Sequence, residues 1–591
     1  MPADEPRSTH PTGWRTFVRL LGFLRPYRAS LIVSTLLAIG AQVAAILVLV
    51  LTGVVIDEVE GDPKLSVLLA LGGVIVLLGL VRGAFTYGRR IISGRQALGV
   101  EYDLRDELYS HFLRLSFGFY DRSQTGQLMS RATIDLQAVR FFLGYGLIFF
   151  AQHVITIAAV TVVLFVYSWQ LALVALAITP VIVLTAFRYS RASHPVLRDV
   201  QQTLADVSTV AEESITGVHV VKSFAQEERR AERFRSAADT VFRKTLAANR
   251  QRAFYVPMLT FLPFVAQALV LLVGGRMVID GSMSLGAVSS FYLLLAMLVM
   301  PLRMLGMWIG QAQRAVAAGE RIFEILDEPE EVADEPDAQP LPEGPGEIVF
   351  EDVSFGYDPA RPVLEDVDLE IGAGRTVALI GPTGSGKTTL ATLVPRFYDA
   401  TRGRVLVDGV DVRRLVRRSL RSEVGVFSQD PFLFSASIRD NIALGMPDAP
   451  FEAVEAAARA AQAHEFVLEL PHGYDTVVGE RGITLSGGQR QRIAIARALL
   501  IDPRILVLDD ATASVDATTE AKIRAGLREV MRGRTTIIIA HRLSTIALAD
   551  EIVVVDQGRI VARGTQAELL ESSPVFREIH EHGLLQQVVA G

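Results

Sequence analysis

The chain has 591 residues, of which 50% are hydrophobic, and its formal net charge is -7 at pH 7. This length predicts more than one domain, and so high a hydrophobic share is typical of a protein with several membrane spans. The absence of a basic excess argues against nucleic acid as a partner, and the absence of Cys excludes disulfides, thiol catalysis and Cys-ligated zinc.

The first 28 residues form the first predicted segment, a polar tail followed by a short amphipathic stretch. Apolar and Arg positions interleave over residues 14–25, which favours a helix lying in the membrane interface. A plain cytoplasmic lead-in to the first span is the alternative. Both interpretations place Arg15, Arg19, Arg25 and Arg28 on the cytoplasmic side.

Six apolar stretches follow, within a predicted membrane domain of residues 29–326. A helix needs about 20 residues to cross about 30 Å of hydrocarbon, and each stretch meets or nearly meets this length. The sequence therefore predicts six membrane-spanning helices. The stretches are residues 31–56, 65–85, 141–167, 171–187, 254–279 and 285–309.

The spans are joined alternately by short connections and by two long polar segments, residues 86–140 and 188–253. The long segments are rich in Arg, whereas the short outer connections carry acids such as Asp57 and Asp280. Cytoplasmic loops carry an excess of Lys and Arg, so we expect a multi-pass plasma-membrane protein with both termini and both long segments in the cytoplasm.

Both long segments have the pattern of helices rather than of flexible loops. Pro and Gly are sparse over residues 94–115 and 199–252, and apolar residues recur at helical spacing. About 20 extra helical residues reach about 30 Å beyond the membrane. Each segment has one break, at residues 116–121 and 215–219. The breaks are either ordinary connectors or tips that touch a cytoplasmic motor.

Residues 327–346 are acidic and rich in Pro, which predicts a linker. From residue 347 to 591 short apolar strands alternate with helical stretches, as in an α/β domain. The predicted fold class is therefore an α-helical membrane domain followed by an α/β domain.

A phosphate-binding loop is predicted near the start of this α/β domain. The strand at residues 376–380 runs into G-x-x-x-x-G-K-T and then into a helix, the context that gives this motif its meaning. Backbone N–H groups and the helix N-terminus would hold phosphate, Lys387 would reach the β- and γ-phosphates, and Thr388 would bind Mg²⁺. The predicted ATP-binding residues of the loop are Gly381, Thr383, Gly384, Ser385, Gly386, Lys387, Thr388 and Thr389.

Two further motifs suit a nucleotide site shared between two copies of such a domain. Asp509 ends a second apolar strand, a position that suits a Mg²⁺ partner. A second anion cradle precedes a helix, and one domain rarely needs two for one nucleotide. The second cradle makes sense if it caps ATP held by a partner domain. It consists of Leu485, Ser486, Gly487, Gly488 and Gln489.

These motifs, in this order, resemble the nucleotide-binding domain of the ATP-binding cassette (ABC) family, with residues 485–489 as its signature. The resemblance implies that Tyr357 stacks on adenine, that Gln429 senses Mg²⁺ and that His541 contacts the γ-phosphate. It also implies that Glu480 senses a coupling tip and that Asp516 lies in the loop that crosses the dimer interface.

The membrane half is similar to the exporters of the same family. Tyr120 and Asp121 in the first break, and Gly217 in the second, resemble their coupling-helix regions. The resemblance covers residues 14–585. It implies ATP and Mg²⁺ as cofactors, head-to-tail cassette dimers, a second half-transporter as partner, and alternating access powered by ATP.

One position departs from the family pattern. The residue after the magnesium Asp is usually Glu, which polarises the attacking water, and here it is Asp510. Its shorter side chain sets the carboxylate back by about an ångström, and a misplacement of that size can cost about 10²-fold in rate. We therefore expect ATP binding but slow hydrolysis at this chain's own site, and a heterodimer whose partner carries the Glu. A homodimer, or an Asp510 that works well enough, is the alternative.

The predicted function is ATP-driven export of an apolar or amphipathic substrate, such as a drug or lipid, from a bacterial plasma membrane. Few charges lie in the spans; one is Arg303, which either faces a cavity and meets anionic groups or snorkels to the membrane surface. The alternatives are an importer of the same fold for a siderophore or lipid, and an ATP-gated channel or regulatory subunit.

Overall fold

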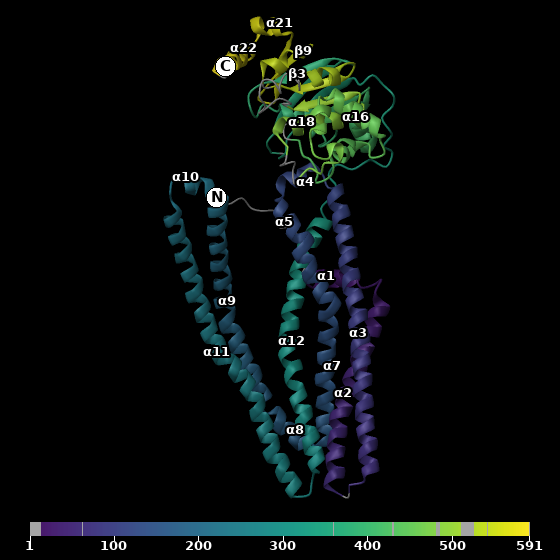
Figure 1. Cartoon of the computed structure of the whole chain (residues 1–591), viewed down its shortest axis with the longest axis vertical. Helices are drawn as coiled ribbons and strands as arrows, with labels where there is room; N and C mark the ends of the chain where they lie inside the picture. The colour runs from purple at the N-terminus through teal and green to yellow at the C-terminus, as the bar shows by residue number, and fades with distance from the viewer. Residues whose placement is uncertain are drawn as a thin grey trace. The chain divides into compact units, whose positions relative to one another are not determined.

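The computed structural model describes residues 13–61, 63–358, 360–427, 431–479, 485–509, 525–540 and 542–589. The chain divides into two compact units (Figure 1). The first contains the residues up to His111 together with Gly126–Asp327. The second contains Phe112–Thr125 and the residues from Glu328 onward. A short segment from the first third of the chain therefore belongs to the same unit as the C-terminal domain.

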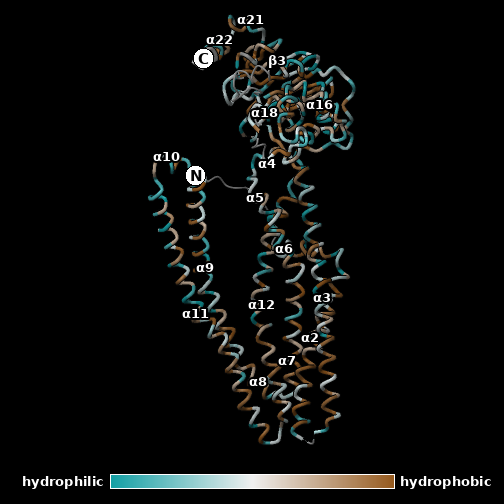
Figure 2. Tube along the Cα trace, in the orientation of Figure 1, coloured by the Kyte–Doolittle hydropathy of each residue, from teal (hydrophilic) through white to brown (hydrophobic). Residues whose placement is uncertain are grey.

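The helices of the first unit confirm the predicted six spans. Within the described residues, six helical stretches are long and apolar enough to cross a membrane. Hydrophobic residues are concentrated along α2, α7 and α8, and hydrophilic residues become more frequent along α9 and α11 toward α10 (Figure 2). The six stretches are Arg28–Glu60, Leu65–Arg114, Thr125–Tyr167, Trp169–Thr216, Glu227–Ile279 and Leu285–Leu326.

Four of the six stretches are single helices, and two are composite. The third contains two π-helical segments, and the fourth is interrupted at Ala177–Ile178, just before Pro180, which cannot continue the hydrogen-bond ladder. Apolar periodicity predicts neither feature. The helices of the chain's first part are α1 (Gly13–Gly22), α2 (Arg28–Glu60), α3 (Leu65–Arg114), α4 (Phe117–Arg122), α5 (Thr125–Ser130), η1 (Arg131–Asp135), α6 (Leu136–Phe141), η2 (Phe142–Gly146), α7 (Leu147–Tyr167), α8 (Trp169–Leu176), α9 (Thr179–Thr216), α10 (Val218–Ser223), α11 (Glu227–Ile279) and α12 (Leu285–Leu326).

The two predicted breaks in the long segments are both present as short helices. The first break is α4, which follows α3 after two residues, and the second is α10, which joins α9 to α11. Helices α9 and α11 pack side by side along their length (Figure 1). The long segments are therefore helical, with one turn-like tip each.

Helices α2 and α12 approach each other closely at two glycines. A Cβ atom on Gly286 would lie 1.9 Å from the carbonyl oxygen of Gly53. Beside this contact, the Asp57 carboxylate accepts hydrogen bonds from the Gly286 N–H at 2.6 Å and from the Ser284 hydroxyl at 2.7 Å. Small residues allow such close packing of membrane helices, and the Asp57 carboxylate adds polar contacts at the start of α12.

The second unit contains two sheets. One has four antiparallel strands in the order β2-β1-β4-β5. The other has six strands in the order β10-β9-β3-β8-β7-β6, all parallel except β10. The strands are β1 (Ile348–Phe355), β2 (Leu364–Ile371), β3 (Thr376–Ile380), β4 (Arg402–Val407), β5 (Val410–Asp411), β6 (Val424–Phe427), β7 (Ile505–Asp509), β8 (Thr535–Ile539), β9 (Glu551–Asp556) and β10 (Arg559–Gly564).

The six-stranded sheet separates two hydrophobic cores. Side chains on a strand alternate between faces. On β3, Val377 and Leu379 pack into one core, whereas Ala378 and Ile380 pack into the other. The sheet is thus covered on both faces, as parallel sheets are. The helices of this part are α13 (Lys387–Leu393), α14 (Arg417–Ser422), α15 (Ile438–Ile442), α16 (Phe451–Ala460), α17 (His464–Leu468), α18 (Gly487–Leu500), α20 (Leu543–Ile546), α21 (Gln566–Ser572) and α22 (Pro574–Val589).

The contact between α2 and α12 yields a prediction about stability. Gly286→Ala should force the two helices apart, and overpacking of this kind costs about 1–3 kcal/mol. We expect a lower thermal denaturation midpoint for the purified protein in detergent. Gly275→Ala is the matched control, because an added Cβ there meets nothing within 4 Å. Equal midpoints for the two variants would contradict the close approach.

Candidate nucleotide site

The phosphate-binding loop lies between β3 and α13, as predicted, and its shape requires glycine at two positions. Gly381 has φ +152° and Gly386 has φ +101°. A Cβ atom at Gly381 would lie 1.9 Å from the carbonyl oxygen of Val555, and one at Gly386 would lie 2.7 Å from a methyl carbon of Leu364. The loop is therefore held tightly against its surroundings while its backbone curls around the start of α13.

Lys387 is the first residue of α13, and its side chain folds back over this loop. The side chain is buried, and its Nζ donates to the carbonyl oxygens of Gly381 at 2.9 Å and Pro382 at 2.8 Å. Burial lowers the pKa of Lys387, and the nearby Asp509 carboxylate acts in the opposite direction. A buried ammonium is stabilised by an anion, so the position suits a phosphate group.

The predicted magnesium partners converge on one cavity. Asp509 ends β7, which pairs with β8, and β8 in turn pairs with β3. Asp509 and Thr388 both line a cavity of about 690 Å³ together with Tyr357. Carboxylate and hydroxyl oxygens are ligands that Mg²⁺ accepts. The loop, the buried Lys387 and these oxygens fit a magnesium nucleotide.

Tyr357 lies at the side of the same cavity. Its ring is half exposed, and its hydroxyl oxygen lies 3.2 Å from the hydroxyl oxygen of Thr389. The ring is therefore anchored by α13 while one part stays open to solvent. An exposed ring beside a phosphate loop is available for stacking on a base.

Helix α4, which contains the predicted coupling residues Tyr120 and Asp121, borders this cavity too. Phe117 stacks on Phe397 with ring centroids 4.4 Å apart. The Tyr398 hydroxyl donates a hydrogen bond to Asp121. Burial raises the pKa of Tyr398, and the hydrogen bond to Asp121 raises it further, so this phenol stays protonated and remains a donor.

Acids of the linker hold the other side of α4. Glu331 accepts hydrogen bonds from Arg122 at 2.7 Å and from the Ser116 hydroxyl at 2.9 Å. The hydrogen bond from Arg122 contributes most to lowering the pKa of Glu331. Arg114 forms a further ion pair with Glu330 at 2.8 Å. The linker therefore packs against α4 and the residues just before it.

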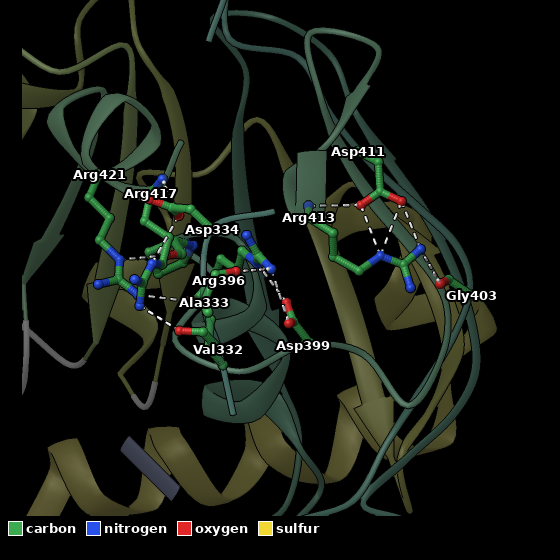
Figure 3. A network of polar contacts seen from close by, with 11 residues as sticks. Val332, Ala333, Asp334, Arg396, Asp399, Gly403, Asp411, Arg413, Arg417 and Arg421 are labelled. Carbon is green, nitrogen blue, oxygen red and sulfur yellow. Dashed lines mark hydrogen bonds and ion pairs between the residues drawn. The ribbon is translucent and has the colours of Figure 1, made fainter. Parts of the chain in front are cut away.

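The next linker residues are fixed by arginines of the C-terminal domain (Figure 3). Arg417 pairs with Asp334 at 3.0 Å and also donates to the carbonyl oxygen of Val332. Arg396, which is 3% exposed, donates to the carbonyl oxygen of Ala333 at 3.1 Å and pairs with Asp399. Composition predicts only an acidic linker, and no local pattern marks these arginines as its partners.

The signature segment forms the start of α18. Ser486 caps the helix, since its hydroxyl accepts from the Gln489 N–H at 3.3 Å while Gln489 Oε1 accepts from the Ser486 N–H at 2.8 Å. Leu485 and Gly488 are buried, whereas Ser486 and Gly487 are exposed. The exposed end of this 14-residue helix presents backbone N–H groups and the positive end of the helix dipole outward.

Five of the predicted site residues lie outside the described part of the chain, namely Gln429, Glu480, Asp510, Asp516 and His541. Gly217 lies in the first unit, directly before α10. The structure thus brings together Tyr357, Lys387, Thr388, Thr389 and Asp509, with Tyr120 and Asp121 on the adjoining helix. The sequence analysis did not identify Phe397 and Tyr398, because their contact with α4 joins segments that are far apart in the chain.

Family models and relatives agree with this arrangement. The ABC transporter transmembrane region model matches residues 31–302, and the ABC transporter model matches residues 364–513. The ABC transporter ATP-binding protein YknU of Bacillus subtilis is 37% identical over 96% of this chain and 97% of its own length. The ATP-dependent lipid A-core flippase of Syntrophus aciditrophicus is 35% identical over 96% of this chain and 94% of its own length.

Two further matches extend the comparison. The multidrug efflux ATP-binding/permease protein Rv0194 of Mycobacterium tuberculosis is 40% identical over 95% of this chain, which spans 47% of that protein. A solved structure of a bacterial Atm1-family ABC exporter with ATP bound has a TM-score of 0.77 at 30% identity, over 95% of this chain and 98% of that one. These matches cover both the six-helix membrane half and the nucleotide half, and the chain therefore belongs to the ABC transporter family.

Proposed function

We propose that this chain is one half of an ATP-driven exporter of apolar or amphipathic molecules, such as drugs or lipids. The observation that carries the proposal is the single cavity lined both by nucleotide-site residues, Thr388 and Asp509, and by Phe117 and Asp121 of α4. A change at the phosphate loop can thus reach the coupling helix through direct contacts. The names of the relatives, a lipid A-core flippase and a multidrug efflux protein, support the same class of cargo.

Each part of the site has a role in this proposal. Tyr357 stacks on the adenine, the loop N–H groups and Lys387 hold the phosphates, and Thr388 and Asp509 hold Mg²⁺, which neutralises phosphate charge when bound. Gln429 and His541, known here from the sequence alone, complete the γ-phosphate contacts. The exposed N-terminus of α18 then caps ATP on a partner domain, with Glu480 and Asp516 near the interface.

The membrane unit supplies an apolar cavity. It has a volume of about 420 Å³ and lies among α8, α9, α11 and α12. Its lining is aliphatic for the most part, with Thr179, Tyr189, Thr260 and Arg303 as polar members. A cavity of this kind suits a molecule with a large apolar body. Arg303 is part of its lining, which supports the interpretation that this side chain faces a cavity.

We propose further that the partner is a different half-transporter. Asp510 stands where the family pattern has Glu, and the shortened carboxylate makes hydrolysis slow at this chain's own site. The signature at residues 485–489 follows the pattern in full, so it can complete a competent site on a partner. One degenerate and one competent site favour a heterodimer in a bacterial plasma membrane, with the nucleotide domains and both termini in the cytoplasm.

Export can be tested in inside-out vesicles that contain the purified complex. We expect uptake of an amphipathic dye against its gradient in the presence of Mg²⁺ and ATP, because the cytoplasmic face is then outside the vesicle. A non-hydrolysable ATP analogue is the control and should give no accumulation. ATP-dependent loss of dye preloaded into the vesicles would indicate an importer, and passive equilibration gated by ATP would indicate a channel.

ATP binding can be tested on the phosphate loop itself. Lys387→Ala should weaken photolabelling of this chain by an ATP analogue at least about tenfold, because charge-assisted hydrogen bonds to phosphate are worth about 1.5–3 kcal/mol. Lys64→Ala, which removes a lysine at the start of the second span, is the control. Unchanged labelling of the Lys387→Ala chain would exclude the assigned role.

Asp510→Glu tests the degenerate site. Restoring the longer carboxylate should raise hydrolysis at this site by up to about 10²-fold. The measurement is site-resolved trapping of nucleotide in the purified complex, whose intact mass is determined first. A complex of two different half-transporters together with this gain supports the proposal. A mass of twice this chain, with no gain, would make Asp510 the working base of a homodimer.

A further inference from the structure

A second cavity of the membrane unit lies beneath α1, apart from the 420 Å³ cavity described above. Its volume is about 540 Å³, which is within the range of small-molecule sites. Helix α1 packs against α12 here, and residues of η2 and α7 also line the cavity. Every lining residue belongs to this one chain and to one compact unit.

Aromatic rings form much of the cavity wall. Trp14 stacks on Phe17 with centroids 5.6 Å apart, and Phe17 meets Phe142 at 6.1 Å. Phe150 and Trp308 complete the aromatic lining. The faces of such rings carry negative electrostatic potential and attract cations.

One polar atom in this wall has no partner. Trp308 is 6% exposed, and its indole N–H forms no hydrogen bond within the described part of the chain. A buried indole N–H usually finds an acceptor, and a buried donor without one costs about 1–3 kcal/mol. The Nε1 atom itself is enclosed by protein, since Trp308 stacks on Phe149 and Phe141 with centroids 5.4 and 5.9 Å apart, so the ring contributes apolar surface to the cavity wall.

The charge of the lining is negative. Glu320 is the one ionisable residue among the described residues that line the cavity. Other acids near it on the chain are neutralised: Glu324 pairs with Arg131 at 3.4 Å, and Asp327 pairs with Arg19. Glu320 forms no ion pair among the described residues, and the neighbouring Arg321, with which it interacts electrostatically, is paired with Asp135, so the Glu320 carboxylate is available to a ligand.

The lining changes character along α12. Glu320 and Trp308 are twelve residues apart on this helix, which corresponds to about 18 Å. The lining near Glu320 includes the small residue Gly13 of α1, whereas the lining near Trp308 includes Ile309 and Phe150. An elongated cavity with one acidic end and one apolar end has the shape of an amphiphile.

We propose that this cavity binds an amphipathic cation, independently of the transport direction proposed above. Its ammonium head lies at Glu320 and against the aromatic faces, and its alkyl body extends toward Phe150 and Ile309. Such a molecule is either a cationic drug-like cargo or a cationic lipid of the surrounding bilayer.

The three tryptophans of the chain make the site directly observable. Trp14 and Trp308 line the cavity, and Trp169 does not. In a Trp169→Phe complex in nanodiscs, a trimethylammonium probe with a terminal bromine on its alkyl chain should quench the cavity tryptophans saturably. Subtracting the signal of a complex with all three replaced by Phe removes fluorescence from any partner chain. The matched control probe carries a sulfate in place of the ammonium.

Glu320→Gln should weaken binding of the cationic probe by roughly fivefold, the upper range for a partly exposed ion pair. Glu324→Gln, one turn further along α12 and outside the lining, should leave it unchanged. Ala312→Leu narrows the cavity and should also weaken quenching. This second variant keeps the proposal testable if Glu320→Gln does not fold. Quenching that does not saturate, that is equal for the sulfate probe, or that is unchanged in both cavity variants would overturn the proposal.

The two sources of such a ligand can be separated in the same assay. Relief of quenching upon addition of Mg²⁺ and ATP supports the site and identifies the probe as cargo that is moved away. Unchanged quenching during turnover supports the site as one for a resident lipid. If the vesicle assay showed no transport, the proposed export function would fail, but saturable, Glu320-dependent quenching would still support the cavity site. The two proposals can therefore fail separately.

Discussion

The contact of α4 with Phe397 and Tyr398 is the interaction on which the proposed coupling of this chain depends. Phe397 and Tyr398 follow closely after α13, the helix that begins with Lys387. Helix α4 follows α3, which runs without interruption from the second membrane span to Arg114. The segment that follows α3 therefore packs, as part of the second unit, on residues that follow the phosphate loop and α13.

The chemistry of this contact favours a fixed arrangement over a sliding one. An aromatic stack can slip, but the hydroxyl of the half-buried Tyr398 binds one carboxylate, that of Asp121, and Glu331 binds both Arg122 and Ser116. Hydrogen bonds have preferred distances and angles, so these polar contacts favour one orientation of α4 against the stacked ring.

Local patterns were sufficient to predict the elements of this protein, but not how these elements meet. Apolar runs predict the six spans because a bilayer demands about 20 apolar residues per helix, and the phosphate loop is predicted because its glycines and Lys387 act within eight consecutive positions. The Tyr398–Asp121 contact joins residues 277 positions apart, and nothing in either segment alone indicates the other. The arginines that hold the linker were missed for the same reason.

Helix α12 connects the cavity beneath α1 to this contact through the covalent chain. It runs unbroken from Leu285 to Leu326, and the acids that pair with Arg114 and Arg122 follow within five residues of its end. The boundary between the two units falls between Asp327 and Glu328, directly after α12, so Glu320 and the linker acids follow one another in the chain but belong to different units.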